Sequence, residues 1–263
     1  MALVVLTWGC GKPRLDLPTG PFTPVTDATA ALADAFGHCT NLQTMTLELA
    51  LSGRAAGQRV RARLLAGLTA DNAIRLEAVA PFGPPGFILA GNGQTSVLLL
   101  PRDDRVLRDV PPREILAALA GVHVEPRELL AFLSGCPGAS PSAVGARAVG
   151  EEWMLVDLGD MGGLAYLKRR TTWTPTAVVR DRLRVVFDEW RGQQPGLVRL
   201  ESVGAPGRAS FELALRPSQV ERNVTLPASA FSVEIPADAE PITIEELRRA
   251  GPMRDSQPDD RVS

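Results

Sequence analysis

Residues 44–69 decide the fold, and they read TMTLELALSGRAAGQRVRARLLAGLT. In the first half, apolar residues at positions 45, 47, 49 and 51 alternate with mostly polar ones. In the second half, apolar residues at positions 60, 62, 64, 66 and 68 keep the same period, and arginines stand at positions 59, 61 and 63. A period of two is typical of a β-strand with one buried face. Because Gly53 and Gly57 lie between the two runs, this stretch predicts an antiparallel hairpin.

The same alternation extends on both sides of the hairpin. It continues to residue 108 with short turns rich in Gly, Asn and Asp, and it resumes over residues 142–216. Helical patterns occur over residues 28–37, 112–120, 126–134 and 242–251, and the middle two begin with Pro, which favours the first position of a helix.

These elements together predict the fold class. A sheet of roughly ten or eleven strands twists strongly and tends to curl. We therefore predict an α+β fold in which a curled antiparallel sheet forms an incomplete β-barrel. Helices are expected to cover the concave face, where they can enclose an apolar cavity.

The N-terminal residues MALVVLTWGC end a short apolar run with Gly9 and Cys10. This pattern indicates residues 1–9 as a truncated lipoprotein signal peptide, cut before a cysteine that then carries lipid. No basic residue precedes the run, and Thr7 stands where the lipobox usually has Leu. The alternative is a chance apolar N-terminus with an ordinary cysteine. Prolines and glycines in residues 10–25 predict an extended tether after the lipidated Cys10.

Composition excludes several classes of function. The chain of 263 residues has 28 Lys and Arg against 30 Asp and Glu, which is a poor balance for binding nucleic acid. No apolar stretch of about 18 residues is present to span a membrane as a helix. Cys39 and Cys136 either form a disulfide or are buried thiols, and with two histidines the chain has no zinc-binding spacing. No cofactor is expected.

Catalytic motifs are missing. The chain has no GxSxG elbow. Asp103 and Asp104, flanked by arginines, are typical of a solvated turn. We therefore predict that the protein is not an enzyme; Ser134 and Asp104 are the best candidates for the contrary hypothesis.

The loop APFGPPG at residues 80–86 places Phe82 in a Pro/Gly-rich turn between two strands. There an aromatic side chain either folds back under its own turn or protrudes as an apolar finger toward a membrane or an acyl chain.

The chain resembles the LolA/LolB family of bacterial lipoprotein carriers and acceptors over most of residues 26–235. The likeness is clearest in APFGPPGFIL at 80–89, LLLPRDDRVL at 98–107 and LLAFLSGCPG at 129–138. The resemblance implies a half-barrel whose helical lid encloses a hydrophobic cavity for acyl chains. LolB, itself an outer-membrane lipoprotein, has a Pro-Leu-Gly loop whose Leu protrudes toward the membrane, and Phe82 would take that role. The imperfect lipobox and the longer C-terminus depart from LolB.

Strand and helix phase select candidate residues for the cavity lining: Leu47, Leu49, Leu64, Leu76, Ile88, Leu98, Leu100, Ile115, Leu119, Leu129 and Phe132. Any of them can instead belong to a solid core.

The expected organisation is a single LolB-like domain over residues 26–252, followed by a disordered tail over 253–263. The expected function is a lipid-anchored protein on the periplasmic face of the outer membrane. It would take acylated lipoproteins or lipid, delivered by a periplasmic carrier protein, and help insert them. The alternative is an envelope structural lipoprotein that uses the same fold as a platform for protein partners.

Overall fold

One curled sheet organises the molecule. The computed structural model describes residues 15–138, 141–204 and 211–250. In these residues the sheet has 15 strands, and its order is β1-β8-β9-β10-β11-β12-β13-β14-β2-β3-β4-β5-β6-β7-β15. Neighbouring strands are antiparallel except β15 and β7. The outermost strands, β1 and β15, do not pair with each other, so the barrel is incomplete. The predicted fold class is confirmed, although the strands are more numerous than expected.

The strands divide into two groups on either side of the β14–β2 pair. The first group is β2 (Thr44–Ala55), β3 (Gln58–Thr69), β4 (Ile74–Ala78), β5 (Ile88–Gly91), β6 (Ser96–Leu100), β7 (Arg105–Val110) and β15 (Glu240–Pro241). The second group is β1 (Thr23–Val25), β8 (Gly145–Val149), β9 (Trp153–Asp157), β10 (Leu164–Arg169), β11 (Trp173–Arg180), β12 (Leu183–Asp188), β13 (Leu197–Ser202) and β14 (Phe211–Arg222).

The hairpin predicted from residues 44–69 is the centre of the sheet. β2 and β3 pair along their full lengths, with Leu47 opposite Ala66 and Leu49 opposite Leu64. These side chains are buried on the concave face, and the alternating arginines of β3 are exposed on the convex face. The period of two therefore separates the two faces as predicted.

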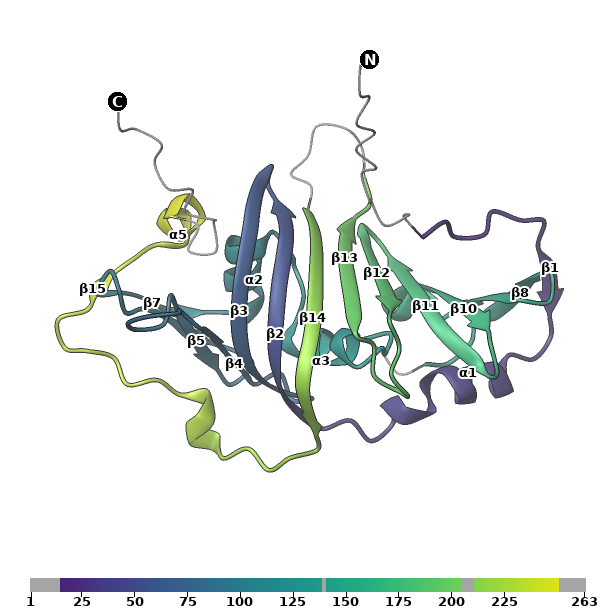
Figure 1. Cartoon of the computed structure of the whole chain (residues 1–263), viewed down its shortest axis with the longest axis horizontal. Coiled ribbons are helices and arrows are strands. Elements are labelled where there is room, and N and C mark those ends of the chain that lie inside the picture. The colour runs from purple at the N-terminus through teal and green to yellow at the C-terminus, as the bar shows by residue number, and fades with distance from the viewer. Residues whose placement is uncertain (1–14, 139–140, 205–210, 251–263) are drawn as a thin grey trace, which may run out of the picture.

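The predicted helices are present at the expected places. They are α1 (Thr29–Phe36), α2 (Pro112–Ala120), α3 (Pro126–Leu133) and α5 (Ile244–Ala250), with a short α4 (Gly159–Gly162) and the 3-10 turns η1 (Gly37–Cys39) and η2 (Ala228–Phe231). The helices α2 and α3 lie behind the central strands in Figure 1, on the concave side of the sheet.

Local chemistry explains where these helices begin and end. The Asp27 carboxylate accepts a hydrogen bond of 2.8 Å from the Thr29 N–H ahead of α1. Pro112 and Pro126 occupy first helical turns, and Gly121 ends α2 with a φ of 73°. A left-handed residue of this kind is usually Gly, because it has no Cβ to clash.

The edges of the sheet differ from the prediction. Residues 23–25, assigned to the tether, form the edge strand β1, which pairs with β8. After β14 the chain runs along the convex side of β4 and β5 toward β15, and we call residues 223–243 the strap. The strap ends in β15, which pairs in parallel with β7, and it leads to α5, which packs against α2. Residues 1–14 and 251–263, with the predicted signal peptide, Cys10 and the whole predicted tail, lie outside the described residues.

No helix in the described part of the chain is long and apolar enough to cross a bilayer.

Candidate functional site

An apolar cavity lies between the concave face of the sheet and the lid formed by α2, α3 and their linker. Its volume is about 60 Å³, and no polar atom contributes to its surface. It is lined by Leu49, Leu51, Leu64, Leu76, Phe87, Leu116, Leu119, Ala120, Val122, Val124, Leu129, Leu200, Leu213 and Leu215. This cavity is the candidate site for an apolar ligand.

The predicted lining residues fall into three groups. Five of them line the cavity: Leu49, Leu64, Leu76, Leu119 and Leu129. Five others are buried in the surrounding core without lining it: Leu47, Leu98, Leu100, Ile115 and Phe132.

The assignment of Ile88 to the cavity is wrong. Ile88 pairs with Glu77 on one side and Leu99 on the other, whereas its neighbour Leu89 pairs with Leu76. Paired residues point to the same side of a sheet. Ile88 therefore points to the convex face with Glu77, and Leu89 is the inward residue, fully buried in the core.

Sequence reasoning missed nine of the fourteen lining residues, and five of the nine form two sets. Leu200, Leu213 and Leu215 come from the second group of strands, whose alternation was visible but whose position beside β2 was not. Val122 and Val124 come from the linker between α2 and α3, where they alternate with polar residues like a strand. That alternation was a signal that could have found them.

The cavity is closed in this structure. For comparison, an engineered apolar cavity of about 150 Å³ binds a molecule as small as benzene, and this cavity of about 60 Å³ is too small for an acyl chain. A longer apolar ligand requires the lid to separate from the sheet. The contacts that hold each lid helix therefore decide how the site can open.

The C-terminal end of α3 is fixed. A disulfide joins Cys136, just after α3, to Cys39 of η1. Beside it, His38 Nε2 donates to the Ser134 carbonyl oxygen at 3.0 Å. Gln194 donates to the Leu133 carbonyl oxygen at 2.8 Å and accepts a hydrogen bond from Arg222.

The surroundings of His38 favour its neutral form. Burial lowers the pKa of His38 below its usual value, the hydrogen bond to Ser134 opposes that shift, and the nearby Arg222 charge lowers the pKa further. A neutral imidazole donating through Nε2 suits the buried carbonyl group that it contacts.

The other end of α3 is held by an ion pair. Glu128 on α3 pairs with Arg180 on β11, and both side chains are largely buried. Arg180 also donates to the Met161 carbonyl oxygen at 2.8 Å. α3 is therefore held at both ends, by β11 at one and by η1 and Gln194 at the other.

The helix α2 is held differently. In the described residues its ion pairs are those of Arg113 with Glu114 at 3.5 Å and with Glu125 at 3.6 Å, and no polar contact joins α2 to the sheet. Leu116 and Leu119 meet the sheet through apolar contact alone. Of the two lid helices, α2 is thus the one with fewer directional contacts to the rest of the molecule.

The loop of residues 79–87 between β4 and β5 presents Phe82 to solvent. The Phe82 side chain is 90% exposed, so it does not fold back under its turn. Arg102 stabilises the loop by donating to the carbonyl oxygens of Phe82 at 3.2 Å and Pro84 at 3.1 Å. The finger is held in place while its tip stays free of contacts with the core.

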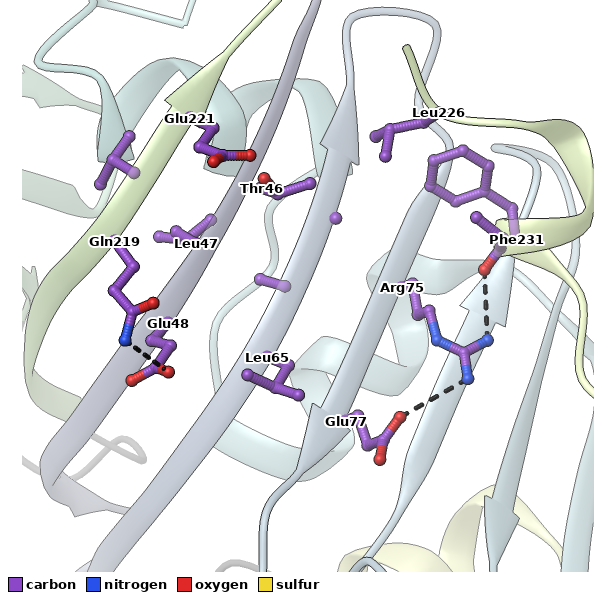
Figure 2. A pocket seen from close by; sticks show the side chains of 14 residues that line it. Thr46, Leu47, Glu48, Leu65, Arg75, Glu77, Gln219, Glu221, Leu226 and Phe231 are labelled. Carbon is purple, nitrogen blue, oxygen red and sulfur yellow. Dashed lines mark hydrogen bonds and ion pairs between the residues drawn. The ribbon is translucent and has the colours of Figure 1, made fainter. Parts of the chain in front are cut away.

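A second hollow, on the convex face, has a different character. Figure 2 shows Leu65, Leu226 and Phe231 between the strap and the sheet, with Glu48 and Glu77 among the charged side chains around them. It is an open groove with a volume of about 650 Å³. Because charged and apolar residues both line it, it differs from the wholly apolar cavity under the lid.

The polar residues considered for catalysis are dispersed. Ser134 is fully buried, and its hydroxyl has no hydrogen-bond partner in the described part of the chain. Asp104 lies in the exposed turn between β6 and β7. His38 lies within 3.8 Å of both cysteine sulfurs, but sulfurs joined in a disulfide are not the thiolates that bind metals.

Neither a protein-family model nor a curated protein sequence matches the chain. Several solved structures have a similar shape. One is a LolA superfamily protein. That structure, NE2245 from Nitrosomonas europaea, is 12% identical in sequence, and the match covers 78% of this chain and 94% of that one with a TM-score of 0.48. A DUF1329 family protein from Desulfovibrio piger is 12% identical, covering 75% and 92%, with a TM-score of 0.45.

The lipoprotein LppX from Mycobacterium tuberculosis is 11% identical, and the match covers 76% of this chain and 96% of LppX with a TM-score of 0.32. Likenesses at these levels carry no information on ligand or function, which have to be argued from the chain's own residues.

Proposed function

We propose that this protein is a LolB-like lipoprotein that binds acyl chains of lipoproteins or lipid between its sheet and its lid. The observation that carries the proposal is the wholly apolar cavity beneath a helix, α2, for which the described residues show no polar contact with the sheet. The proposed protein is anchored through Cys10 to the periplasmic face of the outer membrane, receives its cargo from a periplasmic carrier, and is not an enzyme.

Binding would proceed by displacement of α2. Burial of each methylene group contributes about 0.8 kcal/mol, so an acyl chain entering between α2 and the sheet replaces the apolar contacts that the helix gives up. The leucines at positions 49, 51, 64 and 76 give the chain a continuous apolar surface. α3 stays in place because the disulfide and the Glu128–Arg180 pair hold its ends.

Phe82 would deliver the bound chain to the membrane. An exposed aromatic ring on a stiff loop enters the interface between headgroups and acyl chains at low entropic cost, because the loop is already ordered. The hydrogen bonds from Arg102 supply that order.

The test is binding of a triacylated lipopeptide to the chain with Cys10→Ser, which removes the anchor. Ala120→Phe fills the cavity, and Ala117→Phe makes the same change on α2 away from the cavity lining. We expect the Cys10→Ser protein and the Ala117→Phe variant to bind the lipopeptide in a fluorescence titration and the Ala120→Phe variant to bind weakly. A folded Cys10→Ser protein that leaves the lipopeptide unbound would rule out the proposed function.

The second candidate is a structural lipoprotein that serves as a platform for protein partners. The groove of Figure 2 favours it, because Leu65 is 45% exposed there beside charged side chains, a composition suited to a protein interface. A pull-down that recovers a partner lost in the Leu65→Glu variant, from a protein that binds no lipopeptide, would support this candidate.

A further inference from the structure

We propose that the convex face of the β2–β3 hairpin binds a membrane surface rich in anionic phospholipid headgroups. Four arginines carry this inference, and we call them the arginine surface: Arg54, Arg59, Arg61 and Arg63. All four are exposed, and within the described residues none of them is in an ion pair.

The register of the hairpin concentrates their charge. Arg54 on β2 lies directly opposite Arg59 on β3, and Arg61 and Arg63 follow on the same face of β3. Like charges directly opposite each other destabilise a sheet. An anion bound across this face would relieve that repulsion.

Three of the four, Arg54, Arg59 and Arg61, border a hollow of about 650 Å³ that extends toward β13 and β14. Its other charged residues are Arg199, which pairs with Asp188 at 3.6 Å, and Glu212, which lies opposite Arg54. Positive charge therefore exceeds negative charge in the hollow, and its size suits phosphate-bearing headgroups.

The arginine surface is continuous with the exposed finger. The Val79 N–H donates to the Arg63 carbonyl oxygen at 2.8 Å, at the point where the loop that carries Phe82 begins. Val79 is 45% exposed and Phe82 90%. Basic side chains beside an exposed apolar tip are the combination that binds an anionic bilayer surface, because headgroups attract the charges and the interface receives the apolar groups.

The opposite end of the convex face has the opposite charge. Glu48, Glu77 and Glu221 line the groove of Figure 2, with Arg75 as the one cation among its lining residues. This division orients the molecule, since an anionic surface attracts the arginine end and repels the carboxylate end. The net charge of −2 gives no sign of this separation of charge between the two ends of the face.

The inference uses the membrane contact of the proposed function but not its acyl-chain binding. The experiment is cosedimentation of the full chain, carrying Cys10→Ser, with phosphatidylcholine vesicles and with vesicles that also contain phosphatidylglycerol. Arg61→Gln/Arg63→Gln is compared with Arg127→Gln/Arg170→Gln, which removes the same charge from exposed residues of α3 and of the turn after β10.

We expect binding only when phosphatidylglycerol is present, and weaker binding as salt rises. At low salt, Arg61→Gln/Arg63→Gln should reduce the partition coefficient roughly 30-fold, about fivefold per arginine, whereas the control pair should change it little. Phe82→Ser should weaken vesicle binding without changing its salt dependence.

Equal losses in the two double variants, or equal binding to both kinds of vesicle, would overturn the inference. So would binding to heparin without binding to vesicles, which would identify a soluble polyanion as the ligand. Lipopeptide binding distinguishes the two proposals. Ala120→Phe should lose lipopeptide binding and keep vesicle binding, whereas Arg61→Gln/Arg63→Gln should keep lipopeptide binding and lose vesicle binding.

Discussion

Gly135 shows how a single residue fixes the end of the lid. Its φ is 80°, and a Cβ added there would lie 2.3 Å from the Trp190 ring. Gly57, in the turn between β2 and β3, has nearly the same φ of 79° but nothing within 4 Å of an added Cβ. The two glycines therefore share backbone strain and differ in packing.

Replacing each glycine by alanine separates these two effects. Gly57→Ala should lower the free energy of unfolding by about 1–2 kcal/mol, the cost of a left-handed conformation. Gly135→Ala should cost about 1–3 kcal/mol more, because the ring of Trp190 must move. Urea unfolding measures both, and equal losses would show that Trp190 does not press on Gly135.

His38 should make stability depend on pH. Because its pKa is lowered in the folded state, the unfolded chain takes up a proton below about pH 6.5 while the folded chain resists it. The free energy of unfolding should therefore fall as the pH drops below that value. Above that value, His38 is neutral in both states and should no longer make stability depend on pH.

The measurement is urea unfolding of wild type and His38→Gln between about pH 7.5 and pH 5.5. Wild type should lose more stability than the variant over this range, and the two should run in parallel at higher pH. A steeper loss in the variant would contradict the assignment of a neutral His38.

At the scale of elements, the sequence predicts the strands and helices well. It predicts less well which face of the sheet each side chain points to. Period-two runs and Pro at the first helical turn depend on neighbouring residues alone, so the central hairpin, α2 and α3 were predictable. The direction of the Ile88 side chain was not predictable, because its neighbours Phe87, Leu89 and Ala90 are all buried. The strap packs η2 against β4 and β5, so β5 carries apolar side chains toward both faces and the alternation disappears.

The proposed movement of α2 can be blocked by a cross-link. A Cβ added to Gly121, just after α2, would lie 3.9 Å from the Cβ of Ala55 at the end of β2, within the usual range for a disulfide. Ala55→Cys/Gly121→Cys should therefore join the end of α2 to the sheet when oxidised.

The cross-linked protein should lose lipopeptide binding, because α2 can no longer leave the cavity. The Gly121→Cys single variant carries the same backbone strain without the bond and should still bind. Unchanged affinity in a fully oxidised double variant would show that the chain enters without displacement of α2.

At the scale of the whole molecule, the C-terminal segment packs against three parts of the sheet and lid. The strap packs over β4 and β5 on the convex side, β15 protects the edge of β7, and α5 brings Leu247 into the core beside α2. The Glu246 carboxylate supports this docking by bonding to Thr243 and Arg105. The sequence predicted α5 as a helix but not its place, because contacts between segments so far apart leave no periodic pattern.

Leu247 should therefore contribute to stability as a core residue, although it lies near the end of the chain. It is fully buried, so Leu247→Ala should lower the free energy of unfolding by about 2–5 kcal/mol. Glu245→Ala, on the same helix, removes only an exposed pair with Arg248 at 3.7 Å, which should cost less than about 1 kcal/mol. Similar small losses in both variants would show that α5 is not docked in solution. A large loss confined to Leu247→Ala would mean that the segment after β14 belongs to the folding unit, so that the lid is held partly by the last helix of the chain.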